Sequence, residues 1–222
     1  MNILVIGEQE NLAECKDKFG HQSHKYSCVS EHREAEKFLM GNDLILDFIL
    51  DEEPDQFEAY ISKPVTALIN TCKISLSELV AMADHKVACT LFGFTGLPTF
   101  LNRSVLETSV WSNEDKPKLK DLCDKLNTPY LVVDDRVGMM TPRVICMIIN
   151  EAYYTVQEGT ATRDDIDSAM KLGTSYPHGP FEWCSLIGVK HVFEVLEALH
   201  HDTRDERYKI CPLLKKEYLK AM

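Results

Sequence analysis

Short apolar runs alternate with helix-like polar segments along the first part of the chain, and this alternation constrains the fold more than any other feature. The first run covers residues 2–6 and is closed by Gly7, and a helix-like stretch follows from about Gln9 to Lys18. Further β-rich runs are Tyr26 to Val29, Leu44 to Ile49, Val65 to Asn70, Lys86 to Phe92 and Tyr130 to Val133. A parallel strand needs a crossover, which is usually a helix. The pattern therefore predicts a doubly wound α/β domain with a parallel sheet.

The character of the chain changes after Arg136. No strand-like run follows, and long helical patterns begin near Thr141. A switch from alternating strands and helices to helices alone is typical of a second domain. The sequence thus predicts an α/β domain over residues 1–136 and an all-α domain over residues 137–222.

Capping signals divide the helical part. Gly159 is a suitable C-cap for the first long helix. Thr162 and Asp165, three residues apart, resemble a capping box that opens the next helix. Asp164, Asp165 and Asp167 are predicted to be first-turn acids that complement the helix dipole. A metal site is the less favoured interpretation, because no histidine or further carboxylate stands nearby in the sequence.

Composition and charge exclude several classes of protein. The 222 residues are 45% hydrophobic and 27% charged, which is typical of a globular protein and unlike a disordered one. The formal net charge of −11 repels polyphosphate backbones and anionic lipid surfaces. No apolar stretch reaches the roughly 18 residues of a membrane span. We therefore expect neither a nucleic-acid partner nor a membrane partner.

The cysteines and the start of the chain bear on the compartment. Eight cysteines are scattered without a C-x-x-C pair, and several lie inside apolar runs, so we expect reduced thiols that are mostly in the core. The first residues run directly into a strand, with no basic segment or cleavage site. These features together predict a cytoplasmic protein.

The helical half carries two motifs at a specific separation. Ile166-Asp167, Ala169-Met170 and Gly173 are followed by Gly179-Pro180-Phe181-Glu182, all within the segment from Gly138 to Gly188. The combination of ID-x-A-M-x-x-G with G-P-F-E is far more specific than either short motif alone. This half closely resembles the C-terminal domain of 3-hydroxyacyl-CoA dehydrogenases.

The first half resembles the same family more weakly. Asp43-Leu44-Ile45-Leu46-Asp47 resembles its third strand, and Asn70-Thr71-Cys72-Lys73 resembles its N-T-S-S turn. The resemblance implies a truncated Rossmann-like doubly wound sheet followed by a helical 3-hydroxyacyl-CoA dehydrogenase C-terminal-type domain. The short spacing from Asp47 to Asn70 indicates that a helical excursion has been trimmed. NAD as cofactor, acyl-CoA as ligand and no metal are further implications.

The glycine-rich phosphate loop that such a domain needs is degenerate. A Rossmann turn uses three glycines, for the tight turn, for backbone approach to phosphate and for helix packing. Gly7 stands at the first position, whereas Gln9 and Leu12 occupy the other two. Glu8 and Glu10 add negative charge beside an anion site. The loop therefore predicts weak or lost NAD binding, and Gly7 by itself is equally well explained as an ordinary turn glycine.

The acid that holds the cofactor ribose in the family falls on Ser30. Glu31, one position later, is the alternative candidate for this role.

The resemblance also implies positions for a catalytic His-Glu pair. In this pair the His takes the proton of the substrate hydroxyl, and the Glu orients the imidazole ring of the His. The His position falls on Thr95, and Glu107 keeps the Glu position. A threonine hydroxyl is not a general base near neutral pH, and losing such a base costs roughly 10²- to 10⁴-fold in rate. Without an imidazole to orient, Glu107 is also explained as a plain strand or loop carboxylate.

Two further family positions are substituted. The substrate-side Ser matches Cys72, a weaker hydrogen-bond donor. The Asn matches Pro142, which has no side-chain amide and suits a helix start. Other residues are candidates to replace the missing groups. His178, in the loop before G-P-F-E, is a candidate substitute base, and His200-His201 is a candidate metal site. Lys209, Lys215, Lys216 and Lys220 are candidates for CoA phosphates, with solvated helix faces as the alternative. The alternative for His178 is a solvated loop histidine, and for His200-His201 a polar helix end that faces solvent.

Two hypotheses follow. The first is an NAD-dependent 3-hydroxyacyl-CoA dehydrogenase of fatty-acid metabolism, with weak or lost oxidation of its substrate. The second is a non-catalytic relative that binds acyl-CoA or a partner as a homodimer through its helical domain. The apolar pattern proposed for that interface comprises Ile145, Ile148, Ile149, Tyr153, Phe181, Leu186, Phe193 and Leu196. A monomer that buries this face internally is the alternative.

Overall fold

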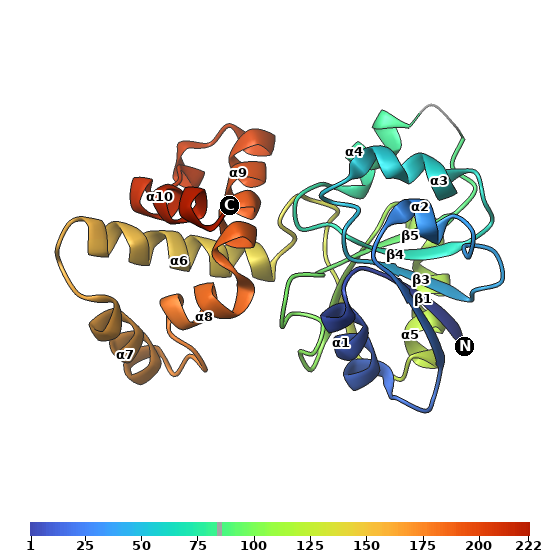
Figure 1. Cartoon of the computed structure of the whole chain (residues 1–222), viewed down its shortest axis with the longest axis horizontal. Coiled ribbons are helices and arrows are strands. Elements are labelled where there is room, and N and C mark those ends of the chain that lie inside the picture. Colours follow the sequence, from blue (N-terminus) through green and yellow to red (C-terminus); the bar gives the residue numbers. More distant parts are fainter. Residues whose placement is uncertain (84–85) are drawn as a thin grey trace. The chain divides into compact units, whose positions relative to one another are not determined.

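Residues 1–83 and 86–222 are described by a computed structural model (Figure 1). The chain divides into two units, Met1–Met139 and Met140–Met222, and each is described by itself. The division falls slightly later than the predicted boundary after Arg136. The reason is a turn that still belongs to the first unit, because the Gly138 N–H donates to the Cys72 carbonyl at 3.0 Å.

The first unit is built on a seven-stranded sheet in the order β2-β1-β3-β4-β5-β6-β7 within the described chain. The strands are β1 (Asn2–Ile6), β2 (Lys25–Val29), β3 (Leu44–Asp47), β4 (Thr66–Asn70), β5 (Thr90–Phe94), β6 (Leu106–Val110) and β7 (Tyr130–Val132). All neighbouring pairs are parallel except β5 and β6. The predicted Rossmann-like, doubly wound sheet is therefore confirmed.

Strand β6 was not predicted from the sequence. Its sequence, Leu-Glu-Thr-Ser-Val, has three polar residues in succession, which hides the strand pattern. In the sheet these residues are buried nonetheless, with Phe94 facing Thr108 across the antiparallel pair. The fifth strand was predicted from Lys86 but begins at Thr90, because Ala88 and Cys89 donate instead to the Ile61 carbonyl.

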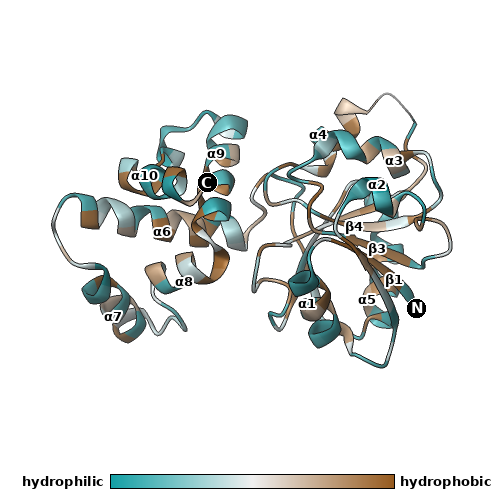
Figure 2. Cartoon of the chain, viewed as in Figure 1, coloured by the Kyte–Doolittle hydropathy of each residue, from teal (hydrophilic) through white to brown (hydrophobic). Residues whose placement is uncertain are grey.

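Helices cover both faces of this sheet. They are α1 (Gln9–Phe19), α2 (His32–Ala35), α3 (Glu58–Ile61), α4 (Leu76–Met82) and α5 (Lys116–Lys125), with 3₁₀ turns η1 (Pro54–Phe57) and η2 (Asn113–Asp115). Helices α1 and α5 pack on one side through Cys15, Phe19 and Leu119. Helices α2, α3 and α4 pack on the other through Ala35, Tyr60 and Leu79. Figure 2 shows the hydrophobic strands β3 and β4 beside the largely hydrophilic α1.

The second unit contains helices only. They are α6 (Thr141–Gln157), α7 (Arg163–Thr174), α8 (Pro180–Ile187), α9 (Val189–Thr203), the 3₁₀ turn η3 (Glu206–Tyr208) and α10 (Pro212–Ala221). The Tyr153 hydroxyl donates to Glu217 Oε2 at 2.6 Å and thereby ties α10 to α6. The residues proposed for a dimer surface are mostly core instead: Ile145, Ile149, Tyr153, Phe193 and Leu196 are buried within this unit. Leu186 is exposed, and Ile148 and Phe181 are half-buried.

The capping box predicted at α7 is confirmed. The Asp165 N–H donates to Thr162 Oγ1 at 3.2 Å, and the Thr162 hydroxyl donates to Asp165 Oδ2 at 2.6 Å. The prediction for Asp167 was wrong. Its carboxylate accepts from the N–H groups of Phe181 at 2.8 Å and Glu182 at 3.1 Å, so it caps the next helix, α8.

The G-P-F-E motif completes this cap. The Gly179 N–H donates to Glu182 Oε2 at 3.0 Å, which satisfies a further amide at the start of α8. A Cβ on Gly179 would lie 2.3 Å from Asp167 Cγ, so glycine is required for the carboxylate to reach the helix. The two motifs that carry the family resemblance are therefore two halves of one helix-capping arrangement.

Within the described residues none of the eight cysteines forms a disulfide; Cys28 is half-buried and the others are buried, so the predicted core location is confirmed for most of them. Across residues 1–83 and 86–222, no helix combines the length and apolar character needed to cross a membrane.

The cap of α8 predicts a stability effect. Asp167→Ala removes both acceptors of the Phe181 and Glu182 amides and should lower the free energy of unfolding by about 1–2 kcal/mol. Asp164→Ala, in the exposed first turn of α7, is the matched control and should cost less than about 1 kcal/mol. Urea unfolding of both variants measures the difference, and equal losses would contradict the capping role.

Candidate functional site

The carboxyl ends of β1, β3, β4 and β5 form the edge where open α/β sheets bind ligands. The chain leaves β1 through α1 toward β2 on one side, while β3 lies on the other side of β1. The strand order therefore reverses between β1 and β3. Gly7 follows the first of these strands and Asp47 ends the second, so the candidate site is built from the turns around them.

The turn after β1 is organised by its own side chains. Gly7 has φ 151° and donates its N–H to the Val29 carbonyl at 2.9 Å. The Glu8 N–H, at the start of α1, donates to Asn11 Oδ1 at 2.8 Å. A Cβ on Gly7 would lie 2.7 Å from the same oxygen. The Asn11 side chain therefore accepts the Glu8 N–H and fills the space beside Gly7, both of which a pyrophosphate would need.

The two substituted loop positions lie on α1. Gln9 is exposed in its first turn, and Leu12 packs on the core cluster that contains Cys15 and Phe19. Glu8 and Glu10 are exposed near the helix start. These residues do not fit a dinucleotide pyrophosphate, because the cradle is narrowed and two carboxylates oppose the phosphate charge.

A buried charge network, missed in the sequence, lies between the ends of β2 and β3. His32 Nε2 is 2.8 Å from Asp47 Oδ2, and His32 Nδ1 is 3.1 Å from Glu53 Oε2. The Tyr60 hydroxyl donates to Asp47 Oδ2 at 3.1 Å, and the N–H groups of Ile49 and Leu50 donate to Asp47 Oδ1 at 3.1 and 2.9 Å. His32 is 3% exposed and Asp47 is fully buried.

The protonation of His32 follows from its partners. Both ring nitrogens face carboxylates, which are acceptors only, so both nitrogens donate and the ring is an imidazolium. Burial alone would lower the pKa of His32, but the hydrogen bonds and charges of Asp47 and Glu53 outweigh it and raise the pKa above its ordinary value. Burial and the Asp47 carboxylate likewise raise the pKa of Tyr60 well above its usual range.

The candidate ribose acid lies beside this network. Ser30 and Glu31 are exposed after β2, and Glu31 is the N-cap residue of α2. Its backbone carbonyl accepts from the N–H groups of Glu34 and Ala35. The residue that follows, His32, is the one whose side chain points into the protein.

Asn70 joins three turns of this edge. Its Nδ2 donates to the Phe48 carbonyl at 3.2 Å and to Asp51 Oδ2 at 2.9 Å, and its Oδ1 accepts from the Gly96 N–H at 2.9 Å. A Cβ on Gly96 would lie 2.8 Å from the Asn70 side chain. The turns after β3, β4 and β5 are thus held together by one buried amide.

Three of the four catalytic positions lie in the first unit. Thr95, directly after β5, is 2% exposed, and Cys72, after β4, is fully buried. Glu107, on β6, is 6% exposed. Burial lowers the pKa of Arg103, and the charge of Glu107 opposes this shift. Pro142 lies in the second unit, buried in the first turn of α6, where it starts the helix as predicted.

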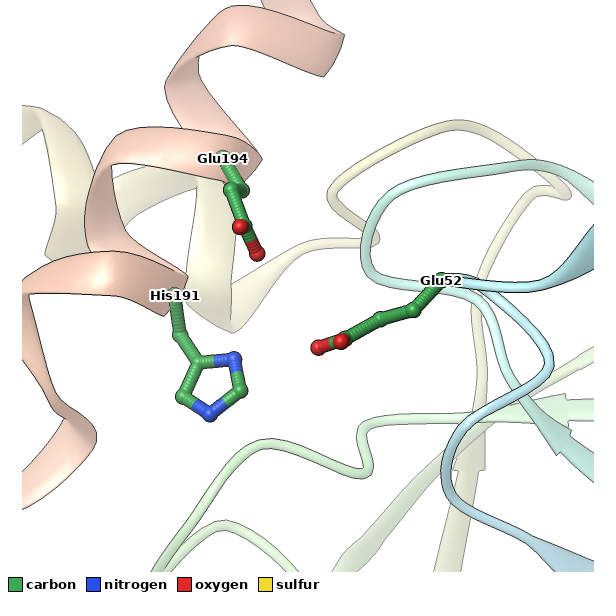
Figure 3. Close-up of side chains that lie close together, drawn as sticks. All are labelled: Glu52, His191 and Glu194. Atoms are coloured by element: carbon green, nitrogen blue, oxygen red, sulfur yellow. The ribbon is translucent and has the colours of Figure 1, made fainter. Parts of the chain in front are cut away.

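The surrogate groups are dispersed. His178 is half-buried, with Nδ1 3.9 Å from Glu182 Oε2 and its ring 6.4 Å from that of Trp183. His201 and the lysines at 209, 215, 216 and 220 are exposed, in agreement with solvated faces. Figure 3 shows His191 and Glu194 on α9, whereas Glu52 follows β3 in the first unit. Because these three come from separate units, they define no metal site within either one.

The buried network predicts a pH dependence. Because the folded-state pKa of His32 lies above the ordinary 6.5, its stabilisation is fully present below that pH and is lost as the pH rises through the folded value. His32→Gln, which breaks a buried pair, should cost about 3–5 kcal/mol near pH 6. The difference between wild type and variant should shrink as the pH rises.

Urea unfolding from about pH 6 to pH 9 measures this dependence. His21→Gln is the control, because His21 pairs with Asp17 in solvent at 2.9 Å and is 65% exposed. A wild-type advantage that grows with pH would contradict the imidazolium assignment.

The fold and the edge define a class of protein. A Rossmann-like sheet with dehydrogenase-like positions at its carboxyl edge, followed by an all-helical unit, is the plan of a two-domain dehydrogenase. Residues 138–221 match the family described as 3-hydroxyacyl-CoA dehydrogenase, C-terminal domain.

Comparisons with individual proteins agree. The chain is 37% identical over 221 residues to a 3-hydroxybutyryl-CoA dehydrogenase of Bradyrhizobium diazoefficiens, covering 95% of this chain and 75% of that relative. A probable 3-hydroxybutyryl-CoA dehydrogenase of Bacillus subtilis is 30% identical over 186 residues, 81% of this chain and 64% of that relative. The chain therefore belongs to the 3-hydroxyacyl-CoA dehydrogenase family, although it matches less than two thirds of the Bacillus relative.

A solved structure has the same fold. The (S)-3-hydroxybutyryl-CoA dehydrogenase of Ralstonia eutropha superposes with a TM-score of 0.70 at 18% identity, covering 99% of this chain and 94% of that chain. At this identity the likeness concerns the fold alone.

Proposed function

We propose that this chain is a 3-hydroxyacyl-CoA dehydrogenase-like protein of acyl-CoA metabolism in which NAD-dependent oxidation is weak or lost. The observation that carries the proposal is Thr95. It is buried at the end of β5, where the family resemblance requires a histidine base. Oxidation of a hydroxyl group needs a group that accepts its proton, and a threonine hydroxyl does not do so near neutral pH.

Other substitutions support the same function. The Glu107 charge acts on Arg103, whose pKa it raises against the lowering by burial. The buried Cys72 thiol is a weaker donor than a hydroxyl. The turn at Gly7 does not fit the NAD pyrophosphate. Substitutions at the proton acceptor and at the cofactor turn together support a proton transfer and a hydride transfer that are weak or lost.

A non-catalytic, dimeric relative is the second candidate, and helix α7 favours it. Ala169, Leu172 and Gly173 are exposed and recur at the spacing of one helical face, whereas Ile166 and Met170 are half-buried. Within the described chain α7 buries none of its residues, and Leu172 is 86% exposed. A second copy that covers this face would form a homodimer through the helical unit, with acyl-CoA or a protein as further ligand. Described cysteines that form no disulfide are compatible with a cytoplasmic location.

Restoring the base alone should not restore the reaction. In Thr95→His, turnover of acetoacetyl-CoA with NADH should stay within about tenfold of wild type, because the turn at Gly7 still excludes the cofactor. Steady-state assays of both proteins measure this, with Thr95→Ala as the control for a change in packing. A rescue of roughly 10²-fold or more would mean that the cofactor site works.

The exposed face of α7 predicts an oligomer. Size-exclusion chromatography with light scattering should give the mass of a dimer, and Leu172→Glu should shift the protein toward monomer by placing a charge in the interface. Leu219→Glu, on the exposed side of α10, is the matched control and should leave the mass unchanged. A strictly monomeric wild type would rule out the dimer.

A further inference from the structure

Phe48 occupies the point at which the strand order reverses. It follows β3 directly, and its N–H donates to the Ile6 carbonyl at 2.9 Å, beside the end of β1. A Cβ on Gly7 would lie 3.2 Å from Phe48 Cβ. The base of the Phe48 side chain therefore lies directly against the turn where a dinucleotide must approach the backbone.

The ring of Phe48 extends from there into the core. Its centroid lies 5.1 Å from that of Phe94, with the planes at 89°, which is a favourable edge-to-face geometry. Phe94 ends β5, so the side chain reaches from the end of β1 to the end of β5. Only 4% of Phe48 is exposed, and it belongs to the cluster with Leu101 and Leu106.

The backbone around Phe48 is held on both sides. The Asp47 carboxylate accepts from the N–H groups of Ile49 and Leu50, and Asn70 Nδ2 donates to the Phe48 carbonyl. These bonds fix the turn so that the phenyl group points inward. A ligand could not displace the ring without breaking the aromatic pair and a buried hydrogen-bonded turn.

We propose that the Phe48 side chain fills the dinucleotide crevice between β1, β3 and β5, so that the folded first unit is closed to NAD by its own core. This inference rests on the proposed loss of NAD-dependent activity and gives it a steric cause. Asn11 adds to the closure by occupying the amide and the space above Gly7. The crevice is a part of the core rather than a vacant binding site.

The test is a calorimetric titration of NADH into the full chain carrying Phe48→Ala or Phe48→Val. Removing the ring opens volume beside Phe94 at the end of β5, while Cβ stays beside Gly7, so Phe48→Ala should bind NADH at least about tenfold more tightly than wild type, with Phe48→Val intermediate. Phe57→Ala is the matched control. Phe57 is 2% exposed, pairs edge-to-face with Tyr60 at 5.5 Å, and lies in the opposite core cluster, so its loss should leave NADH binding unchanged.

Each outcome decides the matter. Tighter binding by the Phe48 variants alone supports the closure, and if Phe48→Ala does not fold, Phe48→Val decides. Folded Phe48 variants that bind no better than Phe57→Ala overturn it, as does micromolar NADH binding by the wild type. Turnover distinguishes the two proposals, because a wild type that binds NADH without oxidising substrate contradicts the closure and leaves the proposed loss of activity standing.

Discussion

The carboxylate of Asp47 is the contact on which the carboxyl edge of the sheet depends. Fully buried at the end of β3, it bonds to the His32 imidazolium, the Tyr60 hydroxyl and two backbone amides. A buried charge is tolerated only when it is paired and hydrogen-bonded, so these partners have little freedom to rearrange. The network fixes the turn that directs Phe48 inward and places His32 at the interior position beside Glu31.

The residues that resemble the family have a structural role in the helical unit and would have a chemical role in the first unit. In the helical unit the motifs cap a helix: Asp167 accepts from the amides at the start of α8, and Gly179 leaves room for it. In the first unit the resemblance would be chemical, and there the residues have changed. The two family motifs of this chain therefore serve the folding of its helical unit. They are compatible with a first unit that lacks NAD binding and a catalytic base.

The sequence predicted the elements that depend on local pattern. The strand at residues 2–6, the strand that begins at Leu44, the helix α1 and the capping box at Thr162 all follow from periodicity and short-range hydrogen bonds. The strand from Leu44 was predicted to reach Ile49 but ends at Asp47. Strand β6 was missed because its burial comes from the neighbours β5 and β7 rather than from its own polar sequence. The His32 network and the Asp167 cap were missed because each joins residues 14 or more positions apart. The positions of Thr95 and Cys72 at the sheet edge followed from the resemblance, whereas their burial did not.

The proposed loss of NAD-dependent oxidation depends on whether the native carboxyl edge of the sheet binds the cofactor. A calorimetric titration of the purified wild-type chain with NADH, repeated in the presence of acetoacetyl-CoA, tests this most directly. We expect no heat of NADH binding in either titration, because Asn11 and Phe48 fill the space beside Gly7. Saturable binding of NADH in the micromolar range, about −8 kcal/mol, would contradict it and restore an active dehydrogenase as the function.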